Sequence, residues 1–322
     1  MRLLYIAILI DIVVAILLGQ LISSQQVYVR NLLFSSIVSD REVPDEPTLD
    51  AKIALGFRDE AKPIQFGQYL DSDKIKRLRV IADRADVNDA LIATSVTHEL
   101  NQLADGTICG IESLGRVVQD TARGLGCCSD FSKAWIFYAR YLGLRVREVN
   151  TMNHTTVEYQ DRRSGRWQMV DPLHHLQIVD PSGQQLSQYS IRGQDLFSAF
   201  HIAQQLPGEP GFDPIRYAGY APTQYATLMW RKGVNFLEIE DWDSRLRRLH
   251  LPKNVRQLIL LTIGIQPGWL MLTTDTLAFY LRTLKALLVL AALLVGVLNL
   301  AALARVPMLL RRRRTPARAA PA

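Results

Sequence analysis

A cysteine, a histidine and an aspartate follow one another along the chain, each in a local segment that suits a catalytic role: Cys128, His154 and Asp171. Cys128 begins a strongly helical pattern, His154 opens a strand-like run and Asp171 closes another. A helix N-terminus and a neighbouring imidazole both favour the thiolate form of a cysteine. A carboxylate can orient the imidazole and fix its tautomer. The three residue types therefore indicate a nucleophile, its base and the group that orients the base.

The hydrophobic pattern predicts the elements that position these side chains. Apolar residues recur at intervals of three and four over residues 128–142, which predicts a helix with Cys128 turned toward the core. Three strands are expected to follow, over residues 144–150, 154–160 and 166–171. Residues 162–165 predict a tight turn between the last two strands. If these strands pair across the turn, His154 and Asp171 lie near each other at matched ends.

Other segments have weaker patterns. Helices are expected from Ser72 onward and over residues 88–103, 111–122 and 193–205. Residues 257–273 are apolar but are interrupted at residues 266–268 by Gln-Pro-Gly, so each half is too short to cross a bilayer. They are interpreted as two buried strands or as an interfacial segment.

Short motifs surround the three candidate residues. Cys128 is followed at fixed spacing by Asp130 and an aromatic residue, Glu158 lies four residues after His154, and Trp167 lies four residues before the Asp-Pro pair at Asp171. Together they resemble the corresponding segments of the transglutaminase-like superfamily, of the membrane-anchored bacterial type, over roughly residues 75–175. The register of the first motif selects Cys128 over Cys127. Thr156 departs from the family pattern, because many relatives carry an aromatic residue there.

The resemblance implies an α+β fold with a papain-like core, in which a helical layer packs on an antiparallel sheet. It also implies acyl transfer from a peptide or protein amide. Cys128 forms the thioester, His154 moves the proton and Asp171 orients the imidazole. Supporting roles fall on the motif residues Asp130, Glu158 and Trp167. A peptidase or amidase is favoured over a crosslinking transglutaminase, and no cofactor or metal is expected. His174 and His175 are adjacent on an extended chain and point apart, which disfavours a metal site.

Two apolar stretches predict membrane helices. Residues 3–19 and 286–304 are each about long enough to cross a bilayer. Six arginines and no acid lie in residues 305–322, which places that end in the cytoplasm by the positive-inside rule. A two-pass protein of the inner (plasma) membrane is expected, with both termini cytoplasmic and the main domain periplasmic. A cleaved signal peptide is the alternative for the first stretch.

The formal charge of +6 comes from this basic tail, because its six arginines account for the whole excess. The rest of the chain is balanced, so the charge does not indicate a nucleic-acid partner. The tail sets topology or contacts anionic lipids of the bilayer.

The expected domain organisation has six parts: a membrane helix at 1–20, an extended lead-in at 21–70, a catalytic core at 71–180, a C-terminal extension at 181–283, a membrane helix at 284–305 and a basic tail at 306–322. The long extension and the membrane helices keep a second class open. That alternative is a non-catalytic scaffold with partners in an envelope or polymer-export complex.

The chain has only three cysteines. If Cys128 stays a free thiol, Cys109 and Cys127 form the only remaining pair. The alternative is that both are small buried residues without a bond.

Overall fold

The computed structural model of the protein describes ten parts of the chain: residues 31–54, 67, 69–84, 88–100, 114–151, 154–192, 201–203, 227–231, 236–266 and 268–313. The chain divides into one unit of residues 35–275 and a second unit of residues 1–34 and 276–322. The candidate catalytic residues all belong to the first of these units.

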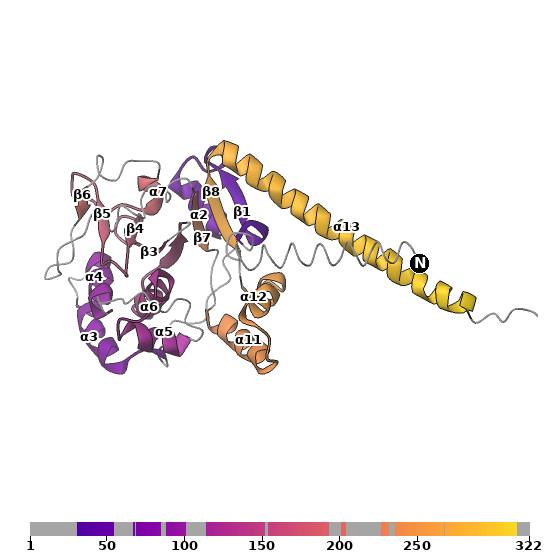
Figure 1. Ribbon diagram of the computed structural model, residues 1–322. Coiled ribbons are helices and arrows are strands. Elements are labelled where there is room, and N and C mark those ends of the chain that lie inside the picture. The colour runs from indigo at the N-terminus through magenta and orange to yellow at the C-terminus, as the bar shows by residue number, and fades with distance from the viewer. Residues whose placement is uncertain are drawn as a thin grey trace, which may run out of the picture. The chain divides into compact units, whose positions relative to one another are not determined.

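A six-stranded sheet lies at the centre of the unit of residues 35–275, with the strand order β1-β8-β7-β2-β3-β4 (Figure 1). Its strands are β1 (Ser36–Ser39), β2 (Val146–Asn150), β3 (Thr155–Gln160), β4 (Trp167–Val170), β7 (Thr227–Arg231) and β8 (Trp269–Thr273). β1 pairs with β8 in parallel, and the other neighbours are antiparallel. The mixed α+β class agrees with the prediction, but the sheet is mixed and not antiparallel, because β1 adds to its edge.

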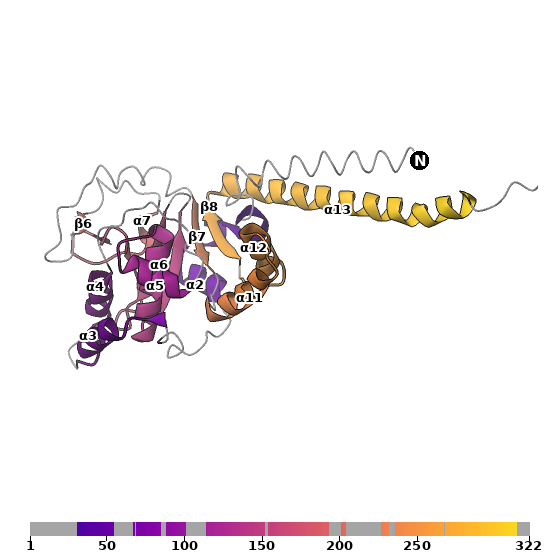
Figure 2. The ribbon, with the colours of Figure 1, turned by 60° about the horizontal axis from the view of Figure 1, so that its bottom comes forward.

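A layer of helices packs with β3 around one hydrophobic core (Figure 2). The helices are α3 (Ser72–Ala82), α4 (Asp89–Glu99), α5 (Leu114–Thr121) and α6 (Cys128–Tyr141). In α6, Phe131, Trp135 and Tyr138 form the predicted buried stripe, and they pack with Val157 and Tyr159 of β3. This stripe fixes which side of α6 faces the sheet, and Cys128 lies at its N-terminal end.

The opposite face of the sheet is covered by α2 (Glu46–Ala54). Leu49 and Ile53 of α2 pack against Val149 of β2 and Trp230 of β7 in a second core. Residues 36–54 therefore form β1, the short 3-10 helix at Asp40–Glu42, and α2, so the prediction of an extended lead-in is wrong for this part. Residues 21–30, 55–66 and 68 of that lead-in lie outside the described residues.

The region after Asp171 differs in part from the predicted elements. It contains β5 (Gln177–Val179), α7 (Gln188–Ile191), β6 (His201–Ala203), α11 (Phe236–Arg248) and α12 (Lys253–Thr262). β6 is a strand where a helix over 193–205 was expected, and the other residues of that range lie outside the described ones. The apolar run at 257–273 is half helix and half strand. Leu260 and Leu261 are buried while Leu258 is exposed, which is a helical periodicity that a short apolar run conceals.

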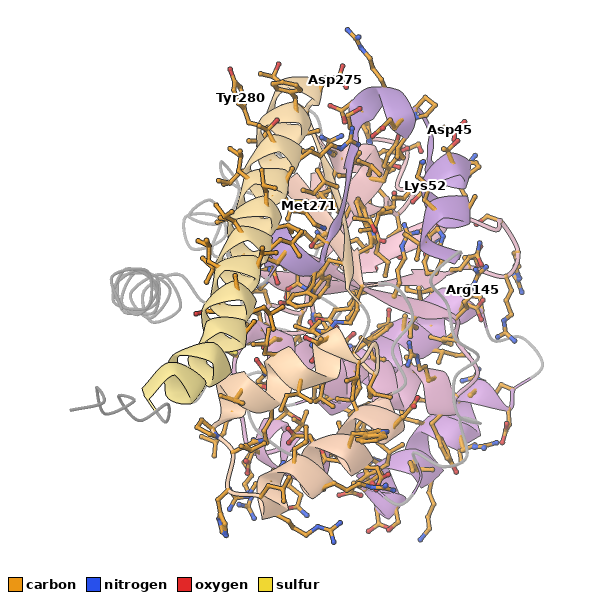
Figure 3. All side chains as sticks on the ribbon, turned by 90° about the vertical axis from the view of Figure 1, so that its right-hand side faces the viewer. Asp45, Lys52, Arg145, Met271, Asp275 and Tyr280 are labelled. Atoms are coloured by element: carbon orange, nitrogen blue, oxygen red, sulfur yellow. The ribbon has the colours of Figure 1, made fainter. Side chains whose placement is uncertain are left out.

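The second unit contains α13 (Asp275–Arg313), a helix of 39 residues. Figure 3 labels Asp275 at its start and Tyr280 in its second turn. Within the described part of the chain, residues 275–301 form one helix that is long and apolar enough to cross a membrane, with a mean hydropathy of 2.4. α13 includes the predicted span at 284–305 and extends beyond it at both ends. The other predicted span, 1–20, lies outside the described residues.

Candidate active site

The thiol of Cys128 lies in the first turn of α6, and Asp130 secures that turn. The backbone N–H of Cys127, the N-cap residue, donates to Asp130 Oδ2 at 3.3 Å. The Asp130 side chain is fully buried, and Lys133 Nζ lies 3.8 Å from its Oδ1. A carboxylate in this position satisfies an otherwise unpaired N–H and interacts favourably with the helix dipole. Asp130 therefore fixes the backbone immediately next to the thiol.

His154 is held by a tight turn that leads into β3. The Thr151 N–H donates to the His154 carbonyl at 2.9 Å, and the His154 N–H donates to Thr151 Oγ1 at 3.0 Å. The imidazole Nε2 lies 2.6 Å from Asp171 Oδ2. The His154 side chain also makes a hydrogen bond with the Cys128 side chain. Since Nε2 is bound to Asp171, we infer that Nδ1 is the nitrogen that bonds to the sulfur.

A second connection joins α6 to β3 at the same place. The Thr155 N–H donates to the Cys128 sulfur. One helical turn after Cys128, Ser132 Oγ donates to the Thr155 carbonyl at 3.2 Å. The backbone N–H and C=O of one β3 residue, Thr155, are thus both bound by α6, which fixes the position of the thiol relative to the imidazole.

Asp171 uses both carboxylate oxygens. While Oδ2 faces His154, Oδ1 accepts the backbone N–H groups of Leu173 at 3.0 Å and His174 at 3.2 Å. The Asp171 backbone pairs with Leu176, with its N–H donating at 2.8 Å. The side chain is fully buried, so each of these bonds orients the carboxylate without competition from water.

The pKa values follow from this arrangement. Burial of the imidazole lowers the pKa of His154, but the charge and hydrogen bond of Asp171 and the hydrogen bond with Cys128 outweigh burial and raise it to about 10. Burial raises the pKa of the Cys128 thiol, but the hydrogen bond and charge of His154, with the Thr155 N–H, outweigh burial and lower it. Both shifts favour the thiolate and imidazolium over the neutral pair, and the charged pair is the reactive form.

A third side chain approaches the same carboxylate. One ligand atom each from His154, Asp171 and His174 lies within 4.8 Å of the others. The 2.6 Å between His154 Nε2 and Asp171 Oδ2 is shorter than the roughly 3.3 Å that two ligands keep around tetrahedral zinc. A metal would also have to displace the proton that His154 holds up to a pKa of about 10. In this geometry the three side chains suit a shared proton better than a metal ion.

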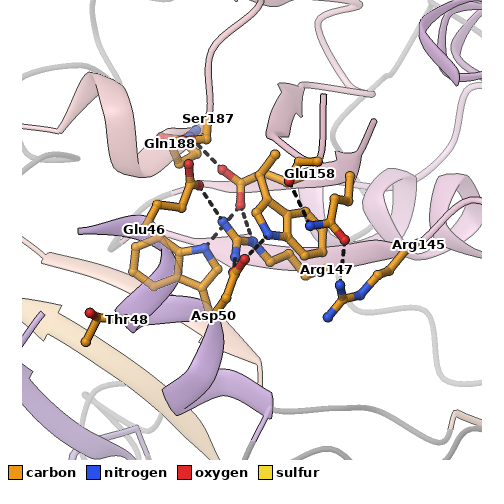
Figure 4. Close-up of polar contacts among 12 residues, drawn as sticks. Glu46, Thr48, Asp50, Arg145, Arg147, Glu158, Ser187 and Gln188 are labelled. Atoms are coloured by element: carbon orange, nitrogen blue, oxygen red, sulfur yellow. Dashed lines mark hydrogen bonds and ion pairs between the residues drawn. The ribbon is translucent and has the colours of Figure 1, made fainter. Parts of the chain in front are cut away.

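The structure places Glu158 and Trp167 away from the three residues. Both lie on the α2 face of the sheet, because they alternate with core residues that face α6. Figure 4 shows Glu158 in a network of polar contacts around the buried guanidinium of Arg147. Arg147 Nε donates to Glu158 Oε2 at 2.5 Å, and its guanidinium carbon lies 4.0 Å from the centroid of the Trp167 ring. These two motif residues support the sheet and the α2 contact, and they do not touch the thiol or the imidazole.

Two carboxylates of α2 complete this network. Arg147 donates to Glu46 Oε1 at 3.0 Å and also to Asp50, and Trp167 Nε1 donates to Asp50 Oδ2 at 2.7 Å. Burial, together with the charge of Glu158, raises the pKa of Glu46 to about 7 although Arg147 opposes the shift. Arg147 is not among the residues expected from the sequence. The available signal was the opposite charges of Arg147 and Glu158 in two consecutive predicted strands.

The cysteines have distinct states. Cys127 is disulfide-bonded, and Cys128 is a free thiol. Cys109 is the remaining cysteine of the chain and lies outside the described residues. Of the two cysteines that the structure describes, the thiol that the motif register selects is therefore the free one.

Comparison with protein-family models, with curated proteins and with solved structures finds no match for this chain. The fold and site alone define a mixed α+β protein with a Cys-His-Asp arrangement in which the histidine and the aspartate are buried and the cysteine is partly exposed.

Proposed function

We propose that the protein is a transglutaminase-like cysteine enzyme, anchored in a membrane, that transfers an acyl group from a peptide or protein amide through a thioester. The observation that carries the proposal is the hydrogen-bonded series Cys128–His154–Asp171, in which the pKa of the thiol is lowered and that of the imidazole is raised. A protein that acts only as a scaffold has no use for an activated thiolate.

In the proposed reaction the Cys128 thiolate attacks the carbonyl carbon of the amide. The tetrahedral intermediate collapses with cleavage of the C–N bond, and the His154 imidazolium gives its proton to the leaving amine. Water then attacks the thioester while His154 takes one of its protons. Cleavage of the C–S bond releases the carboxylic acid and restores the thiolate and imidazolium. Asp171 stabilises the imidazolium in each state in which it carries the proton.

The resemblance of the motifs to the transglutaminase-like superfamily favours water as the acceptor, so peptidase or amidase activity is the proposal. From the same resemblance, we also propose that the fold has a papain-like core. An amine acceptor would use the same thioester and give crosslinking.

The proposed location is a bacterial inner membrane, with two spans, cytoplasmic termini and a periplasmic domain. The membrane-length helix at residues 275–301 and the basic residues after it support this location. The disulfide of Cys127 also supports it, because disulfides persist in oxidising compartments.

The test is the pH dependence of iodoacetamide labelling of the full-length chain in detergent, without reductant and with the site mapped by mass spectrometry. We expect rapid labelling of Cys128 well below pH 8. His154→Ala should slow it at pH 6.5 by about tenfold or more, since the thiol pKa returns toward about 8.5.

His98→Ala is the matched control, because His98 is an exposed histidine on α4. It should leave the labelling profile unchanged. Labelling of Cys128 only above pH 8, equally in all three proteins, would refute the enzyme and favour the scaffold.

A further inference from the structure

The ring of His174 lies next to the imidazole that the proposed reaction uses. The centroids of the His174 and His154 rings are 5.4 Å apart and their planes are inclined by 36°. This separation lies within the range over which aromatic rings attract one another. His174 is partly exposed, whereas His154 and Asp171 are buried.

The turn that carries His174 is built by Asp171 itself. Asp171 Oδ1 accepts the N–H groups of Leu173 and His174, and its backbone pairs with Leu176 to close the turn. The same carboxylate thus holds His154 through one oxygen and fixes the backbone of His174 through the other. The electrostatic effect of His174 also helps to lower the pKa of Asp171.

Resting on the proposed function, we infer that His174 is a positioning residue that holds the plane of the His154 ring between Cys128 and Asp171. While the thiol is free, the hydrogen bonds with Cys128 and Asp171 both hold the His154 ring. Once the sulfur is acylated, the contact with Cys128 is lost, and Asp171 and the ring of His174 remain to keep the imidazole aligned for attack by water. The need for His174 is then greatest in the second half of the reaction.

The experiment uses the full-length chain and the labelling of Cys128 by iodoacetamide between pH 5 and 9. His174→Ala should move the acid limb of the profile to higher pH and lower the rate at pH 6 by about three- to tenfold, the size expected for loss of one aromatic pair. His174→Phe should restore the wild-type limb, because it returns a flat ring to the same position without a titratable group.

Leu173→Ala is the matched control. Leu173 lies in the same turn and packs against the core, and its backbone N–H remains available to Asp171. It should lower stability without moving the limb. A wild-type profile in His174→Ala, or a shifted profile in His174→Phe, overturns the inference.

Failure of this inference is distinguishable from failure of the proposed function. If wild-type Cys128 labels only above pH 8, the enzyme itself is refuted, whatever the His174 variants do. If wild-type Cys128 labels at low pH and His154→Ala abolishes that labelling while His174→Ala does not change it, only the role of His174 is refuted.

Discussion

At the scale of single residues, the reactivity of Cys128 depends on a proton that His154 holds and Asp171 stabilises. Asp171→Asn removes the charge that raises the pKa of His154. The Asp171 charge by itself opposes the thiolate, but loss of the imidazolium at neutral pH outweighs that relief. We expect the acid limb of Cys128 labelling to move to higher pH and the rate at pH 6.5 to fall by about tenfold or more.

The direction in which the labelling rate of Cys128 changes in Asp171→Asn tests the role of Asp171. If Asp171→Asn labels faster than wild type at pH 6.5, direct repulsion between the carboxylate and the thiolate dominates, and the orienting role of Asp171 is wrong. Circular dichroism checks that the variant folds.

Ser132 provides a second prediction at this scale. Ser132→Ala breaks the hydrogen bond to the Thr155 carbonyl, which is buried, and should cost about 1 to 3 kcal/mol of unfolding free energy. It should also weaken the Thr155 contact with the sulfur and raise the thiol pKa slightly. Urea denaturation and the labelling profile measure the two effects. Ser129→Ala, in the same turn, is the control that leaves the Thr155 bond intact.

At the scale of elements, α2 joins the sheet through a charged network whose stability depends on pH. The carboxyl of Glu46 has a folded-state pKa of about 7 against an ordinary value of 4.5. Because the pKa is higher in the folded state, protonation of Glu46 stabilises the fold. This contribution to the unfolding free energy is fully present below pH 4.5 and is lost as the pH rises through about 7. Wild type should therefore lose unfolding free energy across this window.

Glu46→Gln isolates this effect, because glutamine keeps a hydrogen-bond acceptor for Arg147 but does not titrate. Asp50 and Glu158 remain to pair with the guanidinium. The variant should be as stable as wild type at pH 4.5 and more stable at pH 8. Denaturation at both pH values measures this, and a variant that is less stable than wild type at pH 8 contradicts it.

The sequence predicts an element well when the residues that determine its structure lie close together in the chain. α6 and the strands β2 to β4 follow from local periodicity and from one tight turn, and the structure has them within two residues of the predicted bounds. The proximity of His154 and Asp171 follows from the hairpin register. The α2 network does not follow, because Arg147 meets Glu46 and Asp50 about 100 positions away in the sequence. No local pattern indicates such a partner. α12 was missed for a different reason, since a short apolar run fits a strand and a helix equally well.

At the scale of the whole molecule, the oxidation state of the cysteines connects the site with the compartment. The chain has three cysteines, Cys127 is disulfide-bonded and Cys128 is free. In native membranes alkylated before lysis, we therefore expect one labelled cysteine per chain, Cys128, and three after denaturation and reduction. A domain exposed to a reducing cytoplasm would instead show all three labelled before reduction, because such compartments keep thiols reduced.

The same experiment bears on the reactivity of Cys128, since Cys127 is the N-cap of the helix that Cys128 begins. Reduction releases the side chain of Cys127 but leaves its N–H bond to Asp130, so α6 should keep its start. Labelling of Cys128 after mild reduction of the folded chain should keep its low-pH limb. If that limb is lost on reduction and returns on reoxidation, the disulfide and not Asp130 positions the thiol. Cys127→Ser, which has an N-cap hydroxyl and no disulfide, then separates the two contributions, and we expect it to label like wild type.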